Sequence, residues 1–146
     1  MGKKRLRDMT CDDYGISKNR YKELKEFCLQ YGEKKGRIQY GAGGSPPAWE
    51  ISGGRNAGSP VERQAIENES YTKDCKMVEE AAIRANPGIW RYILRSVTQD
   101  LPYEYVEYDE EQRRITVGRT EFYAFRRLFF FYLHEIKIGY KLNEVT

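Results

Sequence analysis

The sequence has few of the side chains that metal proteins and disulfide-rich proteins use. Its 146 residues include one histidine, His134, and three scattered cysteines, Cys11, Cys28 and Cys75, without CxxC spacing. A closed zinc site of Cys and His ligands would need nearly all four. An odd number of dispersed cysteines is typical of reduced thiols rather than of a disulfide framework. We therefore expect no metal site and no disulfide framework.

Long apolar runs are also absent. No run approaches the roughly 20 residues that span a bilayer, and the basic start MGKKRLR leads into polar sequence. A signal peptide would continue into an apolar stretch at that point. The sequence therefore predicts a cytoplasmic protein with no membrane partner.

Motifs of the common catalytic classes are missing as well. The chain has no GxxxxGK[ST] phosphate loop and no GxGxxG, HExxH or GxSxG motif. The acidic run 109–111 lacks helical or EF-hand spacing, which favours a solvated turn over a cation site. A lone histidine on an apolar helix, such as His134, is more often a partly buried structural side chain than a catalyst. We expect a protein that is not an enzyme and that has no cofactor.

What the sequence does contain predicts a mainly α fold. Hydrophobic residues make up 40% and aromatic residues 14% of the chain, enough for a core. Apolar positions three and four apart predict a helix from Ser17, its N-cap, to about Tyr31. The capping-box pattern at 59–62 starts a long helix that Asn86 and Pro87 end after about 26 residues. Residues 41–58 between them are Gly/Pro-rich, as in linkers.

The C-terminal third predicts further helices. Residues 89–97 have a wide apolar face, and the sequence QDLP after them marks a break. Residues 103–117 fit either an elongated turn or a small β-hairpin, and the pattern leaves both open. Residues 119–138 are apolar on nearly every side, which predicts burial in the core or against a partner.

These elements predict a helical bundle with a long central helix and a C-terminal helix-turn-helix. The expected organisation is a basic N-terminal tail and helix at 1–40, the linker at 41–58, and a domain at 59–146 that holds the long helix and the helix-turn-helix. Such long helices often form dimer seams, so a homodimer through the long helix or the aromatic C-terminal helix is a further expectation.

Basic residues gather in two places. Residues 1–40 hold 11 Lys or Arg against 6 Asp or Glu, and residues 112–127 hold five arginines and one glutamate. A recognition helix starting near Arg119 would bury its phenylalanines and offer long polar side chains to the major groove of DNA. Arginines just before it would hold phosphates, and the outer side of the first helix offers further cations. The predicted DNA-binding residues are Arg113, Arg114, Arg119, Thr120, Tyr123, Arg126, Arg127, Lys18 and Lys22.

Two segments carry a resemblance to a known family. The residues IWRYILRSVTQDLPYEYV and ITVGRTEFYAFRRLFFFYL look like the C-terminal region of small phage-encoded transcription regulators of the RinA and ArpU type. The turn written I-S-R-S-T-F-Y in those regulators is here VGRTEFY, residues 117–123, preceded by a longer stretch at 107–116. The resemblance implies a helix-turn-helix similar to sigma-factor region 4, in a phage or prophage of low-GC Gram-positive bacteria.

Two functions from different classes follow. The first is a phage or prophage transcription regulator that recognises double-stranded DNA in the bacterial cytoplasm. The alternative is a protein-interaction module that binds a host protein, such as RNA polymerase or a defence enzyme of the CRISPR effector kind. In that case the aromatic residues 129–132 and the acidic loop would form the contact.

Overall fold

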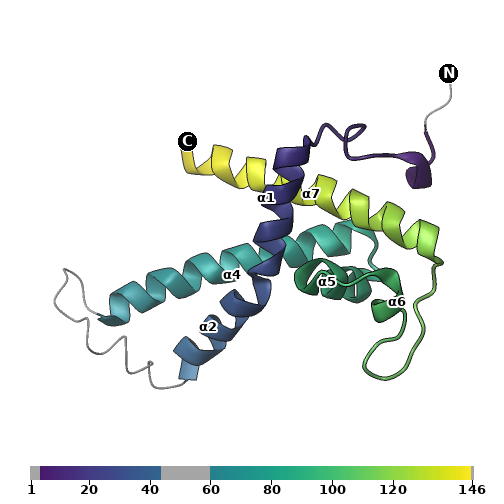
Figure 1. Cartoon of the computed structure of the whole chain (residues 1–146). Helices are drawn as coiled ribbons and strands as arrows, with labels where there is room; N and C mark the ends of the chain where they lie inside the picture. Colours follow the sequence, from purple (N-terminus) through teal and green to yellow (C-terminus); the bar gives the residue numbers. More distant parts are fainter. Residues whose placement is uncertain (1–3, 44–59, 146) are drawn as a thin grey trace. The chain divides into compact units, whose positions relative to one another are not determined.

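The structure, a computed structural model, describes residues 4–43 and 60–145, with the backbone alone for 39–43, 60 and 140–145. Within these ranges the chain forms helices and no strand (Figure 1). The prediction of a mainly α fold is confirmed. The elements are η1 (Leu6–Asp8), α1 (Lys18–Leu29), α2 (Tyr31–Gly43), α4 (Pro60–Ala85), α5 (Trp90–Gln99), α6 (Tyr103–Val106) and α7 (Arg119–Val145).

The chain divides into two compact units. One consists of Met1–Gln30 together with Met77–Thr146, and the other of Tyr31–Lys76. Of the expected linker, residues 41–43 belong to the last turn of α2, and residues 44–58 lie outside the described part of the chain. The expected division at 1–40, 41–58 and 59–146 stays a prediction.

The long middle helix is present as predicted. α4 runs over 26 residues, from Pro60 to Ala85, while its expected N-cap, Ser59, lies outside the described ranges. The helix ends where Asn86 turns its side chain back to accept a hydrogen bond from the Gly88 N–H at 2.9 Å. Pro87 follows and has no N–H to continue the helix.

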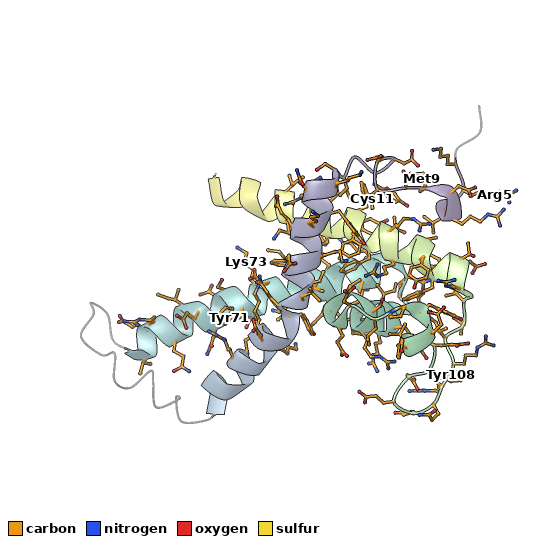
Figure 2. All side chains as sticks on the ribbon, viewed as in Figure 1. Arg5, Met9, Cys11, Tyr71, Lys73 and Tyr108 are labelled. Carbon is orange, nitrogen blue, oxygen red and sulfur yellow. The ribbon has the colours of Figure 1, made fainter. Side chains whose placement is uncertain are left out.

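The smaller unit pairs α2 with the first part of α4. Lys34 Nζ lies 2.8 Å from Asp74 Oδ2, and Arg37 donates a hydrogen bond to the Tyr71 hydroxyl at 3.4 Å. Figure 2 marks Tyr71 on α4. The Cys75 thiol lies 3.9 Å from the Tyr31 carbonyl oxygen. This unit is therefore joined largely by polar contacts along two helices.

The larger unit is built around α7. This helix contacts η1, α1, α5 and α6, and its side chains Phe122, Phe129, Phe130 and Leu133 are 0–1% exposed. The prediction that an all-round apolar helix must be buried is confirmed. The aromatic face expected to meet a partner protein is instead covered within the chain, since Tyr14 packs on Phe131 at 5.2 Å between ring centroids.

α1 lies against this core. Ser17 caps it by accepting a hydrogen bond from the Arg20 N–H at 3.1 Å, as predicted. Leu24 and Cys28 are fully buried, and the Tyr21 ring meets Phe130 edge-on at 5.0 Å. The expected helix to Tyr31 is in fact two helices, because α1 ends at Leu29 and α2 begins at Tyr31.

Residues 103–117 do not form a β-hairpin. They begin with α6, and the segment after it has one isolated antiparallel bridge, between Tyr108 and Arg114. Figure 2 shows Tyr108 on this segment. The hairpin alternative is therefore wrong and the extended turn is right. The reason is the side chain of Asp109, described below.

Two findings concern sites that the sequence did not predict. No helix in the described ranges is both long enough and apolar enough to cross a membrane. Among the same residues, no group of three His, Cys, Asp or Glu side chains is arranged to hold a metal ion. Cys11, Cys28 and Cys75 are free thiols.

Candidate nucleic-acid interface

The break between α5 and α6 is set by Asp100 and Ser96. Asp100 adopts the left-handed conformation, with φ 52°, and its N–H bonds back to the Ser96 carbonyl. The buried Ser96 hydroxyl donates to the Leu101 carbonyl at 2.6 Å. Pro102 then precedes the first residue of α6. These contacts end α5 and turn the chain sharply, as the sequence QDLP predicts.

α6 fixes the start of α7 through Tyr103. The Tyr103 N–H donates to the Tyr123 hydroxyl at 3.1 Å, and the Tyr103 hydroxyl donates to the Val117 carbonyl at 3.2 Å. Its ring also contacts Phe122, with centroids 5.6 Å apart. Because Tyr123 accepts this bond at the N-terminus of α6, its hydroxyl serves the fold and not a ligand.

Asp109 organises the segment between α6 and α7. Its carboxylate accepts hydrogen bonds from the N–H groups of Glu111 at 2.9 Å and Arg113 at 2.7 Å. The bond from the Arg113 N–H holds the pKa of Asp109 below its usual value. The Tyr92 hydroxyl donates to the Arg113 carbonyl at 3.0 Å, which ties the segment to α5. The acidic run is thus a turn with a structural carboxylate.

Four of the predicted contact residues are exposed around the start of α7. Arg113, Arg114 and Arg119 have side chains 65–66% exposed, and Thr120 is also exposed. Each arginine has a carboxylate partner. The pairs are Arg113 with Asp109 at 3.0 Å and Glu111 at 2.9 Å, Arg114 with Glu107 at 2.9 Å, and Arg119 with Glu104 at 3.1 Å.

Arg126 and Arg127 have different surroundings. The Arg126 side chain is 15% exposed, lies over the Phe130 ring at 5.5 Å and has Asp100 3.8 Å away. Arg127 donates to the backbone carbonyls of Met9 at 2.7 Å and Arg7 at 2.9 Å. These guanidinium groups are therefore held by the fold, which argues against their predicted place in a DNA groove.

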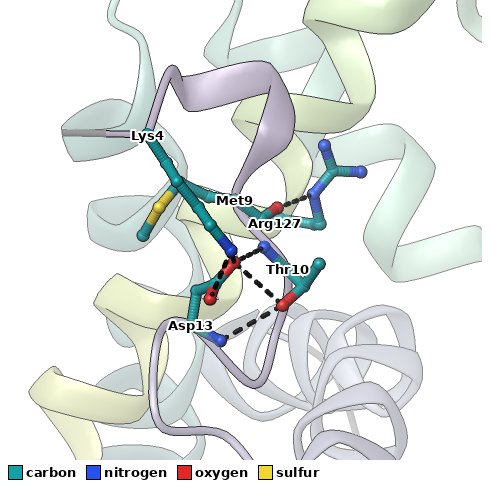
Figure 3. A network of polar contacts seen from close by, with 5 residues as sticks. All are labelled: Lys4, Met9, Thr10, Asp13 and Arg127. Carbon is teal, nitrogen blue, oxygen red and sulfur yellow. Dashed lines mark hydrogen bonds and ion pairs between the residues drawn. The ribbon is translucent and has the colours of Figure 1, made fainter. Parts of the chain in front are cut away.

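Arg127 anchors the N-terminal segment, which a basic tail would leave unattached (Figure 3). In the same network Lys4 Nζ lies 3.0 Å from Asp13 Oδ1, and Asp13 accepts from the Thr10 N–H at 2.9 Å. The Thr10 bond and Lys4 hold the pKa of Asp13 below its usual value. Residues 4–13 are thus fastened along α7.

Lys18 and Lys22 are exposed on α1, away from the other predicted residues. Arg20 of the same helix donates to His134 Nδ1 at 2.9 Å, and His134 lies about 22 Å along α7 from Arg119 at 1.5 Å per residue. Burial, and then Arg20, hold the pKa of His134 below its usual value. The structure therefore separates the nine predicted residues into two exposed sets and one structural set.

The sequence reasoning missed a second pair of arginines. Arg91 and Arg95 on α5 line a groove of about 580 Å³, whose opposite wall holds Arg113 and Arg114. Arg91 is exposed and Arg95 half-buried, whereas Ile89, Ile93 and Val97 on the other side of the segment are buried. The i, i+4 spacing of two arginines opposite that apolar face was a signal for them.

Comparison of the chain with protein-family models, with curated proteins and with solved structures finds no match. The resemblance to phage regulators accordingly stays a prediction from the residues that carry it.

Proposed function

We propose that this chain binds double-stranded DNA through the first turn of α7 and the segment 107–118 before it. The observation that carries the proposal is the exposure of Arg113, Arg114 and Arg119 around a helix start that α6 holds in place. The free N–H groups and partial positive charge of a helix N-terminus also favour phosphate. α6 and the Tyr103 contacts support this turn from behind.

The carboxylates near these arginines do not oppose the proposal. Ion pairs between exposed side chains contribute little to stability, because water screens them and both side chains lose freedom. A phosphate can thus replace Glu104 or Glu107 as the partner of an arginine at small cost. The same carboxylates repel DNA when unpaired, so we expect modest affinity that falls steeply with salt.

The regulator function is the finer part of the proposal. In it, α5 and α6 support α7, whose first turn enters the major groove, with Arg119 and Thr120 as the contact residues. The connection from α6 to α7, residues 107–118, is longer than the usual turn of three or four residues. We propose that it contacts the DNA backbone through Arg113 and Arg114, in a phage or prophage regulator acting in bacterial cytoplasm.

Fluorescence anisotropy with a labelled DNA duplex of mixed sequence tests DNA binding. Replacing Arg113, Arg114 and Arg119 by Ala should lower affinity by roughly 10- to 100-fold at low salt. It should also flatten the dependence of log affinity on log salt by about 2.7, or about 0.9 per lost phosphate contact. The matched control removes three exposed cations of α4, Arg63, Lys76 and Arg84. Equal losses in both variants, or no binding by the unaltered chain, would contradict the proposal.

A second candidate function is binding of a host protein such as RNA polymerase. The observation in its favour is a pair of exposed tyrosines, Tyr105 at 70% and Tyr108 at 49%, beside the paired arginines, since tyrosine and arginine dominate protein interfaces. Purified RNA polymerase captured by the chain, but not by a Tyr105→Ala, Tyr108→Ala variant with normal DNA affinity, would favour this function. Light scattering would test the homodimer expected through the long helix.

A further inference from the structure

We infer that the groove between α5 and the segment 109–116 is a second contact with the DNA backbone, which a phosphodiester strand enters beside the start of α7. This inference rests on the proposed DNA binding and extends it to Arg91 and Arg95. Two walls from distant parts of the sequence bring four arginines together here: Arg91 and Arg95 from α5, and Arg113 and Arg114 from the loop.

The α5 wall supplies the cations that are available to a ligand. Among the described residues, no carboxylate lies within ion-pair distance of Arg91 or Arg95. Arg91 lies over the ring of its neighbour Trp90 at 5.4 Å, and Arg95 donates to the Tyr105 carbonyl. Both guanidinium groups keep further N–H donors for an anion, since each carries five.

The loop wall holds its shape without a ligand. Tyr92 and Asp109, which also line the groove, bind the backbone of Arg113 at 3.0 Å and 2.7 Å. A site with fixed walls loses less conformational freedom on binding than a mobile loop does. Of the acidic residues in the groove, Asp109 is committed to this turn and Glu111 to Arg113. The arginines of α5 therefore face mainly Glu110 as an opposing charge.

The dimensions favour a strand of backbone. Residues i and i+4 of a helix lie about 6 Å apart along its axis, and one strand of DNA carries a charge about every 3.4 Å. Arg91 and Arg95 thus match phosphates one or two nucleotides apart. A groove of about 580 Å³ is too small to admit a whole duplex, so the rest of the duplex would lie over the α7 start.

The test measures DNA affinity of an Arg91→Ala, Arg95→Ala variant by anisotropy over a range of salt. We expect roughly a tenfold loss at low salt and a salt dependence flatter by about 1.8, which is two phosphate contacts. The double variant Arg63→Ala, Arg84→Ala on α4 loses the same charge and should bind almost normally. Because Arg95 also holds Tyr105, Arg91→Ala alone gives a second measurement, with half the change in slope, should the double variant unfold.

The outcomes separate this inference from the proposed function. Normal affinity in the Arg91→Ala variant, with weak binding in the variant that lacks Arg113, Arg114 and Arg119, overturns the groove contact and leaves DNA binding intact. No DNA binding by the unaltered chain overturns both. Competition by inorganic phosphate beyond that of chloride at equal ionic strength would make the groove a small-anion site. Equal competition by polyglutamate would make it a surface for acidic protein. Either result overturns the inference.

Discussion

Arginines 113, 114 and 119 and arginines 126 and 127 belong to one basic stretch of sequence, yet their surroundings differ. The first three are about two-thirds exposed and pair with carboxylates that are themselves on the surface. The other two face the body of the larger unit, where one lies on Phe130 and the other binds backbone carbonyls. The comparison teaches that a cluster of arginines in a sequence can combine ligand contacts with structural contacts.

The largest effect should come from the apolar floor beneath the second set. Phe130 is 1% exposed and contacts both Arg126 and Tyr21. Phe130→Ala should lower the free energy of unfolding by about 3–5 kcal/mol, through lost burial and a cavity. Urea unfolding measures it. The control is Tyr105→Ala, an exposed aromatic that should change stability by less than about 0.5 kcal/mol. Similar losses in both would refute the assigned core.

A smaller effect is expected from Arg127 itself. Arg127→Ala removes two charge-assisted hydrogen bonds to the carbonyls of Arg7 and Met9, and should lower the free energy of unfolding by about 2 kcal/mol. Hydrogen exchange should also become faster at the amides of residues 8–16. Unchanged exchange there, together with unchanged stability, would mean that the N-terminal segment is not fastened by Arg127.

Acid should weaken the contact between α1 and α7. His134 accepts a hydrogen bond from Arg20, and burial keeps its pKa below the usual value of 6.5. The unfolded chain therefore binds the proton more readily than the folded chain, so stability falls as pH drops below about 6.5. Urea midpoints between about pH 7.5 and about pH 5.5 should decrease. In His134→Gln, which keeps an acceptor but does not titrate, this decrease should be smaller; an identical decrease would assign it to other groups.

The smallest effect on stability should come from the exposed set. Arg119→Ala breaks one surface ion pair with Glu104 and should change the free energy of unfolding by less than about 0.5 kcal/mol. Its DNA affinity should nonetheless fall several-fold, as for one lost phosphate contact. Stability measured by urea and affinity measured by anisotropy on the same sample give the comparison. A large loss of stability with full affinity would place Arg119 in the structural set.

Most helices could be predicted from the sequence, because their signals are local. The cap at Ser17, the end at Asn86 and Pro87 and the break at residues 99–102 each depend on neighbouring side chains and backbone. The turn at 103–117 could not be decided, because residues alternating between polar and apolar fit a strand as well. The decisive group is Asp109, whose carboxylate binds N–H groups two and four residues further on.

The candidate site was predictable only in part. Residue type and helix position indicated Arg113, Arg114, Arg119 and Thr120 correctly as exposed polar groups near one helix start. Tyr123 satisfied the same pattern, but its hydroxyl accepts a bond from α6, an element 20 residues away. Arg91 and Arg95 were missed because nothing local connects them with a loop that follows α6.

The sequence alone determined where helices begin and end, and that α7 would be buried, since capping and the spacing of apolar residues act within a few turns. Only the tertiary structure decided which arginines face solvent and which hold the N-terminal segment. Those roles depend on groups more than 100 residues apart, such as Arg127 and the Met9 carbonyl. A guanidinium has the same charge in either place, and what it does depends on whether water or a carbonyl oxygen meets it.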